Sequence, residues 1–300
     1  MSVPLPPSFT YRRIDVDGVG INCAVGGDGP PLLLLHGYPQ THLIWHGVAP
    51  LLLAEHTVVL TDLRGYGDSD KPASSDGDPE YAKRAMTADQ LGVMAALGFD
   101  RFAVAGHDRG GRVAHRLALD APDAVTALAV LDIIPTRHAL NHADKDFGLG
   151  YFHWFFLAAA HGIPERLIGN DPGYWITTRM RARHHGGAEF DPAAVAEYVR
   201  CFSDPAAIAA SCADYRAAAG IDLVHDSADA VAGNVVEAPL LALWGEHSFV
   251  GQSYDVLEVW RGYARTVSGA ALPADHYLPE EAPGQVADAL QEFFGAETIE

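Results

Sequence analysis

Residues 101–112 read RFAVAGHDRGGR, and the turn within them indicates the type of fold. The apolar run Arg101–Ala105 predicts a short strand, and the helical pattern of Val113–Ala121 follows it. Between them lies Asp108, with a glycine two residues away on each side, so a tight strand-to-helix turn would raise its side chain above the sheet. Such a nucleophile elbow usually carries serine. A carboxylate there indicates attack on a saturated carbon, with a halide or an epoxide oxygen as the leaving group.

Charge and composition limit the classes of partner. The 300 residues carry a formal net charge of −19. Binding of nucleic acid or of an anionic membrane requires clustered Lys and Arg, so neither partner is expected. The longest strongly apolar stretches, such as Pro30–Leu35, are far shorter than the roughly 20 residues that span a bilayer. If the substrate is a small anion, arginines inside a cleft must bind it, because the overall field repels it.

Cysteine usage and the start of the chain bear on its compartment. Cys23, Cys201 and Cys212 form no CxxC pair and do not suit a disulfide framework in a chain this long. The first ten residues, MSVPLPPSFT, have no charged leader followed by an apolar core. We therefore expect a cytoplasmic protein. A monomer and a homodimer remain the alternatives for its assembly.

Short apolar runs alternate with helical patterns along most of the chain, which is typical of a mostly parallel sheet covered on both faces. An edge hairpin is expected over Ile14–Val25. The expected inner strands are Leu32–Leu35, Thr57–Leu60, Phe102–Ala105, Ala127–Leu131, Leu240–Leu243 and roughly Ala264–Ala271. The expected core helices are Leu43–Ala54, Ala85–Leu97, Gly110–Asp120 and Pro283–Phe294.

The pattern changes from residue 137 to residue 233. Aromatic residues crowd Tyr151–Phe156, prolines interrupt the helix-like segments, and no convincing strand is present. A chain of this length suits one α/β domain that carries an insertion. We therefore predict an α/β core formed by residues 1–136 and 234–300, with residues 137–233 as an inserted helical lid.

Two turns at strand ends complete the first half of the core. His36-Gly37-Tyr38-Pro39 follows the strand Leu32–Leu35, where a main-chain N–H can face the elbow. The N–H groups of Tyr38 and Arg109 are therefore the predicted oxyanion hole. The turn Asp62–Gly67 has the same pattern, but we interpret Asp62 and Arg64 as residues that hold loops together rather than as catalytic groups.

A general base is required to activate water, and histidine has a suitable pKa. Of fifteen histidines, His276 stands out because it follows the last expected strand and precedes the last helix. His36 and His107 flank the predicted turns and are interpreted as hydrogen-bonded supports, and the pair His184-His185 as exposed lid surface.

No metal or cofactor is expected to take part in the reaction. His138 and His142 have i, i+4 spacing, but they lack the neighbouring glutamate of an HExxH motif. We therefore predict no metal site at this pair.

Two carboxylates are candidates for orienting His276. Asp132 ends the strand Ala127–Leu131, and Glu246 follows the strand Leu240–Leu243. Both strand ends can reach the histidine. A charge surrounded by Ile and Leu needs a partner to offset its desolvation, which favours Asp132, whereas Glu246 has a polar setting typical of a surface loop.

These residues occur in motifs that run along nearly the whole chain. They are LLLLHGYPQTHLIWHGVAP (32–50), DLRGYGDSDKP (62–72), GHDRGGR (106–112), AVLDIIPT (129–136), YFHWFFL (151–157), CADYRA (212–217) and LPEEAP (278–283). In these motifs the chain resembles the haloacetate, and specifically the fluoroacetate, dehalogenases of the α/β-hydrolase superfamily. Related haloalkane dehalogenases and epoxide hydrolases usually have tryptophan directly after the nucleophile, where this chain has Arg109.

The resemblance implies a role for each matching residue. It implies Asp108 as nucleophile, His276 as base and Asp132 as orienting acid. It implies Arg109 and Arg112 as clamps for the substrate carboxylate, and His153, Trp154 and Tyr215 as donors to the leaving halide. The α/β-hydrolase fold is implied with it.

The residues themselves agree with these roles in part. Arg109 and Arg112 are three apart at a helix start, so they share a face beside Asp108 and can hold a carboxylate by charge-assisted hydrogen bonds. Arg116, further along, is interpreted as a surface arginine in salt bridges. Judged without the family, His153, Trp154 and Tyr215 read as lid packing. The family's additional lid tryptophan is missing from the matching stretch, Met180–Gly187.

The expected activity is hydrolysis of a short 2-haloacid, most of all fluoroacetate, to glycolate and halide. The first alternative is an epoxide hydrolase, which needs two lid tyrosines: Tyr215 together with Tyr151 or Tyr174. The second alternative is a hydrolase-fold binding protein without catalysis.

Overall fold

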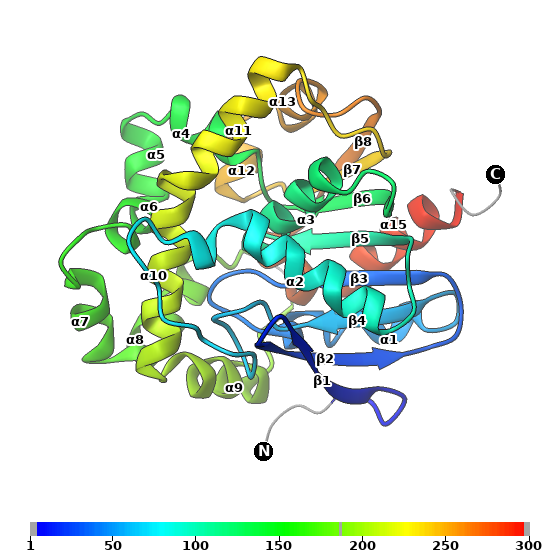
Figure 1. Ribbon diagram of the computed structural model, residues 1–300, viewed down its shortest axis with the longest axis horizontal. Helices are drawn as coiled ribbons and strands as arrows, with labels where there is room; N and C mark the ends of the chain where they lie inside the picture. The colour runs from blue at the N-terminus through cyan, green and yellow to red at the C-terminus, as the bar shows by residue number, and fades with distance from the viewer. Residues whose placement is uncertain (1–4, 186–187, 297–300) are drawn as a thin grey trace.

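A computed structural model describes residues 5–185 and 188–296. One eight-stranded sheet runs through it in the order β1-β2-β4-β3-β5-β6-β7-β8 (Figure 1). β2 pairs antiparallel with β1 and with β4, and the pairs from β4 to β8 are parallel. The strands are β1 Thr10–Val16, β2 Val19–Gly26, β3 Pro31–Leu35, β4 Thr57–Thr61, β5 Phe102–His107, β6 Val125–Leu131, β7 Leu240–Gly245 and β8 Val267–Leu272.

The central strands are continuous apolar runs because helices cover both of their faces. In β3, Leu32–Leu35 are fully buried. The helices α2 and α3 lie in front of the sheet in Figure 1, and α15 lies behind it. The helical segments of the core are η1 His42–Trp45, α1 Ala49–Leu52, η2 Pro79–Tyr81, α2 Lys83–Ala96, α3 Arg109–Asp120, α12 Phe249–Ser253, α13 Val256–Arg261, α14 Leu278–Glu281 and α15 Pro283–Ala296.

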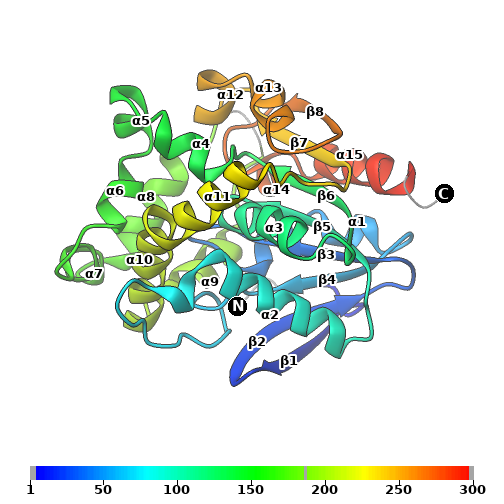
Figure 2. The same ribbon diagram turned by 45° about the horizontal axis from the view of Figure 1, so that its top comes forward.

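A second group of helices, called the lid here, lies between β6 and β7 in the chain. Figures 1 and 2 show it beyond one end of the sheet, the end at which β5 finishes. The lid consists of α4 Thr136–Asn141, α5 Lys145–Gly150, α6 Phe152–Leu157, α7 Ile163–Gly169, α8 Pro172–Ala182, α9 Pro192–Phe202, α10 Pro205–Ala219 and α11 Ile221–Ala232. Because parallel strands present their carboxyl ends at one edge, the lid covers the loops that follow β3, β5 and β6.

The α/β fold expected from the sequence is confirmed, and three details are corrected. The segment Leu43–Ala54 is not one helix: Gly47 and Pro50 separate η1 from α1, because proline cannot continue a helix from its interior. β8 begins at Val267 and is an edge strand with exposed residues rather than an inner one. The short helices α12 and α13 were not expected.

Some sequence expectations fall outside the described residues. Residues 1–4 belong to the N-terminal segment MSVPLPPSFT, for which no leader is expected. Gly186 and Gly187 belong to the stretch Met180–Gly187, from which the family's lid tryptophan is missing. Within residues 5–185 and 188–296, no helix is both long enough and apolar enough to cross a membrane.

Candidate active site

Asp108 occupies the turn between β5 and α3, with φ 48° and ψ −113°. This left-handed conformation is strained for a residue with a side chain, and such strain concentrates at functional turns. The turn closes only because its neighbours are small. A Cβ on Gly106 would lie 2.4 Å from the carbonyl oxygen of Gly110, and a Cβ on Gly37 would lie 2.5 Å from the Cβ of Asp108.

The Asp108 carboxylate has two differently placed oxygens. Oδ1 accepts a hydrogen bond of 2.9 Å from the main-chain N–H of Tyr38, and Oδ2 lies 3.9 Å from Nε2 of His276. Arg109, the other expected oxyanion donor, is the first residue of α3, where a main-chain N–H has no partner within the helix. Among the described residues, none donates a hydrogen bond to Oδ2, which leaves this oxygen free to react.

The Asp108 carboxylate is ionised although it is buried. Burial raises the pKa of this group, but its electrostatic interactions with His276, His107, Arg112 and Arg109 outweigh burial and lower it to about 2. An ionised, desolvated carboxylate with one free oxygen has the properties of a nucleophile.

His276 is brought to Asp132 and not to Glu246. Nδ1 of His276 lies 2.6 Å from Oδ2 of Asp132, whose Oδ1 accepts hydrogen bonds from the Ser248 hydroxyl at 2.5 Å and from the Gly245 N–H at 3.2 Å. Glu246 is half exposed and lies 3.1 Å from a ring nitrogen of His247. The surface-loop interpretation of Glu246 is therefore confirmed.

The imidazole of His276 is held in its neutral form. Burial is the main cause that lowers its pKa well below the ordinary value, and the charge of Arg183 is the next. A hydrogen bond of 2.7 Å between Nε2 of His107 and the carbonyl oxygen of His276 fixes the backbone behind the ring. His107 is thus a support, as expected. A neutral imidazole with Nδ1 directed to Asp132 presents Nε2 as a base.

Arg109 differs from the expected two-armed carboxylate clamp. It is fully buried, and its Nε and Nη2 both donate to the Asp214 carboxylate of α10. Lys83 and the Tyr66 hydroxyl donate to the same carboxylate. Only Nη1 of Arg109 has no hydrogen-bond partner in the described structure. Arg109 can therefore offer one nitrogen to a substrate, and Asp214 neutralises its charge.

Arg112 is the buried arginine at the elbow that forms no ion pair with a carboxylate among the described residues. Its Nη1 donates to the Ile134 carbonyl oxygen at 2.9 Å and to the Thr136 hydroxyl at 3.0 Å, and its Nε has no partner. Burial and the charge of Arg109 lower the pKa of Arg112. A bound carboxylate would offset both effects.

The residues matched to the family's halide site lie together. The Tyr215 ring centroid is 5.7 Å from that of His153 and 6.1 Å from that of Trp154, and the guanidinium of Arg112 lies 4.5 Å from the Trp154 ring. All three rings are buried. The hydroxyl of Tyr215 and Nδ1 of His153 have no hydrogen-bond partner in the described structure. Buried polar groups are rarely left unpaired, so these two are available to a ligand.

Several site residues were missed by the sequence reasoning. Asp214 stands in the CADYRA motif directly before Tyr215, but its pairing with Arg109 spans 105 positions and has no local signal. Arg183 lies in the stretch Met180–Gly187, where the family's lid tryptophan is missing. Its Nη2 lies 4.0 Å from Oδ2 of Asp132 and 3.2 Å from the Tyr151 hydroxyl. Arg179, one turn earlier, is buried as well.

The residues interpreted as structural hold loops together through hydrogen bonds and ion pairs. Asp62 binds the His42 ring and the Asn22 side chain, each at 2.8 Å, and Arg64 binds Asp89. His36 accepts from the Leu63 N–H at 3.0 Å. Arg116 corrects an expectation: it forms salt bridges, but it is only 3% exposed and lies between α3 and α11.

The remaining histidines lie apart from this cluster. The His184 side chain is only partly exposed, whereas His185 is exposed. His138 and His142 stack with ring centroids 4.3 Å apart. Within the described ranges, no group of three or more His, Cys, Asp or Glu is arranged to hold a metal ion.

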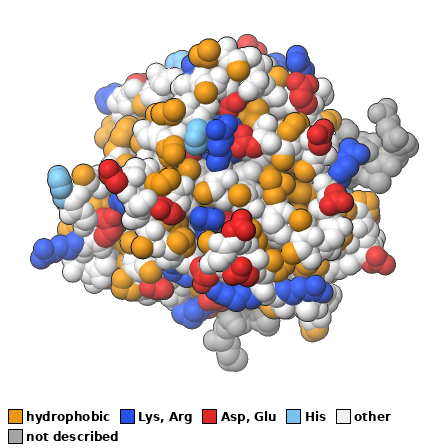
Figure 3. All heavy atoms as spheres, viewed as in Figure 1, with side chains coloured by type: hydrophobic (Ala, Val, Ile, Leu, Met, Phe, Trp, Pro, Cys, Tyr) orange, Lys and Arg blue, Asp and Glu red, His pale blue; other side chains and the backbone are white. Residues whose placement is uncertain are grey.

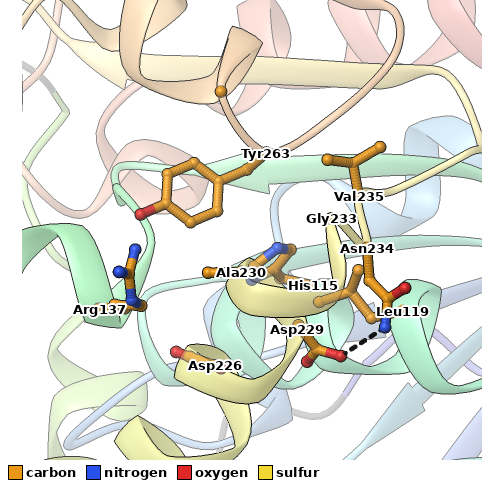
Figure 4. Close-up of a pocket in the computed structure, with 11 residues that line it drawn as sticks. His115, Leu119, Arg137, Asp226, Asp229, Ala230, Gly233, Asn234, Val235 and Tyr263 are labelled. Atoms are coloured by element: carbon orange, nitrogen blue, oxygen red, sulfur yellow. Dashed lines mark hydrogen bonds between the residues drawn. The ribbon is translucent and has the colours of Figure 1, made fainter.

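Four cavities among the described residues contain none of Asp108, Asp132 and His276. A cavity of about 220 Å³ contains His115, Arg137 and Tyr263 but none of the predicted catalytic residues (Figure 4). On the face seen in Figure 3, basic side chains are scattered among acidic and apolar ones. The buried group around Asp108 therefore remains the candidate active site.

The chain is similar to known proteins over most of its length. The family model of the alpha/beta hydrolase fold matches residues 30–283. The chain is 44% identical over 286 residues to a fluoroacetate dehalogenase from Burkholderia sp, covering 95% of this chain and 93% of that protein. It is 34% identical over 294 residues to a soluble epoxide hydrolase from Corynebacterium sp. (strain C12), covering 95% and 97%.

A solved structure is similar over almost its whole length. ALR0039 from Nostoc sp PCC 7120, described as an alpha/beta hydrolase, has 50% sequence identity and a TM-score of 0.94, covering 95% of this chain and 98% of that one. The family model covers residues 30–283, and the relative and the solved structure each cover 95% of the chain. The chain therefore belongs to the fluoroacetate and haloacetate dehalogenases of the α/β-hydrolase superfamily, hydrolases that act on carbon–halide bonds.

Proposed function

We propose that the protein is a hydrolytic dehalogenase of short 2-haloacids, with fluoroacetate as its first candidate substrate. One observation carries the proposal: an ionised Asp108 lies beside Arg112, a buried arginine that has no carboxylate partner among the described residues. The first group attacks carbon, and the second binds the carboxylate next to that carbon. The fluoroacetate dehalogenase relative supports the same reaction.

In the first step, Oδ2 of Asp108 attacks the α-carbon, and the carbon–halogen bond breaks with its electron pair on the halide. Arg112 and Nη1 of Arg109 orient the substrate carboxylate. The unpaired Tyr215 hydroxyl and His153 Nδ1 donate to the leaving halide as its charge grows, together with the Trp154 indole. An ester on Asp108 and a halide ion result.

In the second step, His276 takes a proton from water, and the hydroxide attacks the ester carbonyl carbon of Asp108. Negative charge then forms on Oδ1, to which the Tyr38 N–H already points at 2.9 Å. Asp132 stabilises the protonated imidazole through Nδ1. Collapse of this intermediate breaks the bond between the Asp108 carboxyl carbon and the ester oxygen. His276 returns its proton to that oxygen, which leaves as the hydroxyl of the 2-hydroxyacid, and the Asp108 carboxyl group loses its remaining proton to become a carboxylate again.

The experiment that tests this scheme is halide release from fluoroacetate, chloroacetate and simple epoxides, with wild type and His276→Asn. Wild type should turn over the haloacetates. His276→Asn should release at most one halide per site, because attack by Asp108 does not require the base, and mass spectrometry should find the ester on the Asp108 peptide. A halide burst without an adduct on that peptide would contradict the scheme.

Tyr215→Phe tests the preference for fluoride. Fluoride is the poorest leaving group among the halides, so its departure depends most on hydrogen-bond donors. Single-turnover rates should fall on the order of 10-fold for fluoroacetate and by clearly less for chloroacetate. Equal losses on both substrates would show that Tyr215 only packs the lid.

Epoxide hydrolysis is the second candidate, favoured by the Corynebacterium relative. It requires two tyrosine hydroxyls at the site. Tyr174 is 68% exposed and does not face it, which corrects one of the two expected pairings. Tyr151 is buried, but its hydroxyl already accepts a hydrogen bond from Arg183. Release of diols from the epoxides in the same panel, without halide from haloacids, would favour this candidate.

A further inference from the structure

The lid helix α8 and the residue after it bring two arginines to the catalytic group. Arg183 faces Asp132 and Tyr151, as described above. Arg179 lies one turn earlier and is 9% exposed. Arg181, between them, is exposed to solvent. Their burial sets Arg179 and Arg183 apart from the ordinary polar face of a surface helix.

Arg179 lacks the partners that a buried guanidinium normally has. Its guanidinium carbon lies 5.5 Å from the ring of Phe152 and 5.5 Å from that of Trp175. Its Nε has no hydrogen-bond partner, and it forms no ion pair with a carboxylate in the part of the chain that the structure describes. Contacts with aromatic rings stabilise a cation by less than its burial costs. The rings therefore leave most of the burial cost of Arg179 without compensation.

The charge of Arg179 is directed at the reaction site. After burial itself, it is the main cause of the low pKa of His153. It also acts on the pKa of Tyr38, Tyr215 and His276. These four side chains surround the position where the substrate binds in the proposed function.

Arg179 and Arg112 stand at the two ends of one aromatic wall. Consecutive members of this wall are in ring, hydrogen-bond or cation–π contact. The sequence of contacts is Arg112 to Trp154 (4.5 Å), Trp154 to Tyr215 (6.1 Å), Tyr215 to Tyr38 (5.4 Å), Trp175 Nε1 to the Tyr38 hydroxyl (2.5 Å) and Trp175 to Arg179 (5.5 Å).

The other positive charges of the site are already balanced. Asp214 neutralises Arg109, and Asp132 faces Arg183. A haloacetate would bring one carboxylate, which Arg112 takes in the proposed function. Haloacetate has no second charged group that could bind the guanidinium of Arg179.

We propose that Arg179 binds a second, distal carboxylate, so that the enzyme prefers 2-halo dicarboxylates over 2-halo monocarboxylates. This inference rests on the proposed function, because Arg112 must hold the carboxylate next to the reacting carbon. The chemistry is unchanged: water replaces the halogen through the Asp108 ester, and a 2-hydroxydicarboxylate, a halide ion and a proton are formed.

The test compares kcat/KM for 2-chlorosuccinate and 2-chlorobutanoate, which differ in a carboxylate against a methyl group at the distal end. Wild type should prefer 2-chlorosuccinate at least tenfold. Arg179→Met should abolish this preference, because its kcat/KM for 2-chlorosuccinate should fall at least tenfold more than its kcat/KM for 2-chlorobutanoate. Arg181→Met, on the exposed face of the same helix, is the matched control and should keep the preference.

Equal kcat/KM values in wild type, or a preference that survives in Arg179→Met, would overturn the inference and leave the dehalogenase function intact. Absence of halide from every haloacid would instead overturn the proposed function. If Arg179→Met does not fold, inhibition of wild type by unreactive acids gives the answer. Succinate should inhibit chloroacetate turnover at least tenfold more strongly than butanoate, and equal inhibition would refute the second carboxylate site.

Discussion

Arg183 acts on both partners of the base–acid pair. Burial raises the pKa of Asp132 to about 6, and the charge of Arg183 is the main influence that opposes this rise. The same charge, after burial, lowers the pKa of His276, to which His107 and Arg179 also contribute, whereas Asp108 raises it. Asp108 loses its negative charge when it becomes an ester, so the pKa of His276 falls further in the intermediate.

Replacing Arg183 should therefore shift the pH dependence of ester hydrolysis. In Arg183→Met the lost positive charge lets His276 bind a proton more readily, so its pKa rises. Because the base must be neutral, the acid limb of the single-turnover hydrolysis rate should move to higher pH, by about one unit. Arg183→Lys keeps the charge and should keep the limb in place. An unchanged limb in Arg183→Met would show that Arg183 only packs against Tyr151.

The role of a single residue can be predicted from the sequence when a nearby motif indicates it, and not when its partner lies far away in the chain. Asp108 and His276 were found because each lies in a short motif at a strand end, and Asp132 because its apolar setting demands a partner. Asp214 could not be assigned, because nothing near it in the sequence indicates Arg109. The role of Arg179 was equally hidden, since a lid arginine reads as solvated surface until its burial is known.

At the scale of elements, buried charges attach the lid to the core. Arg116 of α3 binds Asp226 and Asp229 of α11, each at 2.6 Å, and Asp120 of its own helix at 3.0 Å. Arg116 is two turns along α3 from the nucleophile. A contact between α3 and α11 at this point therefore also fixes the helix that carries Arg109 and Arg112.

Arg116→Met should loosen this attachment. The variant leaves the carboxylates of Asp226 and Asp229 partly buried without their cation, which should lower the free energy of unfolding by about 3 kcal/mol. Arg84→Met is the matched control, because Arg84 forms a half-exposed pair with Asp120 and should cost less than about 1 kcal/mol. Urea unfolding of both variants measures the difference, and equal losses would contradict the buried role of Arg116.

Element prediction succeeded where length and periodicity were clear. The buried strands β3 to β7 and the long helices α2, α3 and α15 matched within a few residues. The segment Leu43–Ala54 failed because its apolar residues suit a helix while Gly47 and Pro50 do not. The short helices α12 and α13, of five and six residues, are too brief to show periodicity and depend on tertiary packing.

At the scale of the whole molecule, one neutral acid joins core and lid. Glu280 of α14 is 5% exposed and accepts hydrogen bonds from Gln40, which follows the Tyr38 turn, and from the Tyr198 hydroxyl of α9 at 2.9 Å. Burial raises the pKa of Glu280 to about 8. Near neutral pH this carboxyl is therefore largely protonated, even though the chain has a net charge of −19.

The raised pKa of Glu280 makes the stability of the molecule depend on pH. A group whose pKa is higher in the folded than in the unfolded state contributes stability below its unfolded value, here 4.5, and loses it as the pH rises through about 8. Glu280→Gln cannot ionise, so wild type should lose roughly 3–5 kcal/mol relative to this variant between pH 4.5 and pH 9. Denaturant midpoints of both proteins across this range measure the change, with Glu292→Gln on the exposed face of α15 as control. A constant difference between wild type and Glu280→Gln would mean that Glu280 is ionised in the folded protein, and that its two donors bind a buried charge.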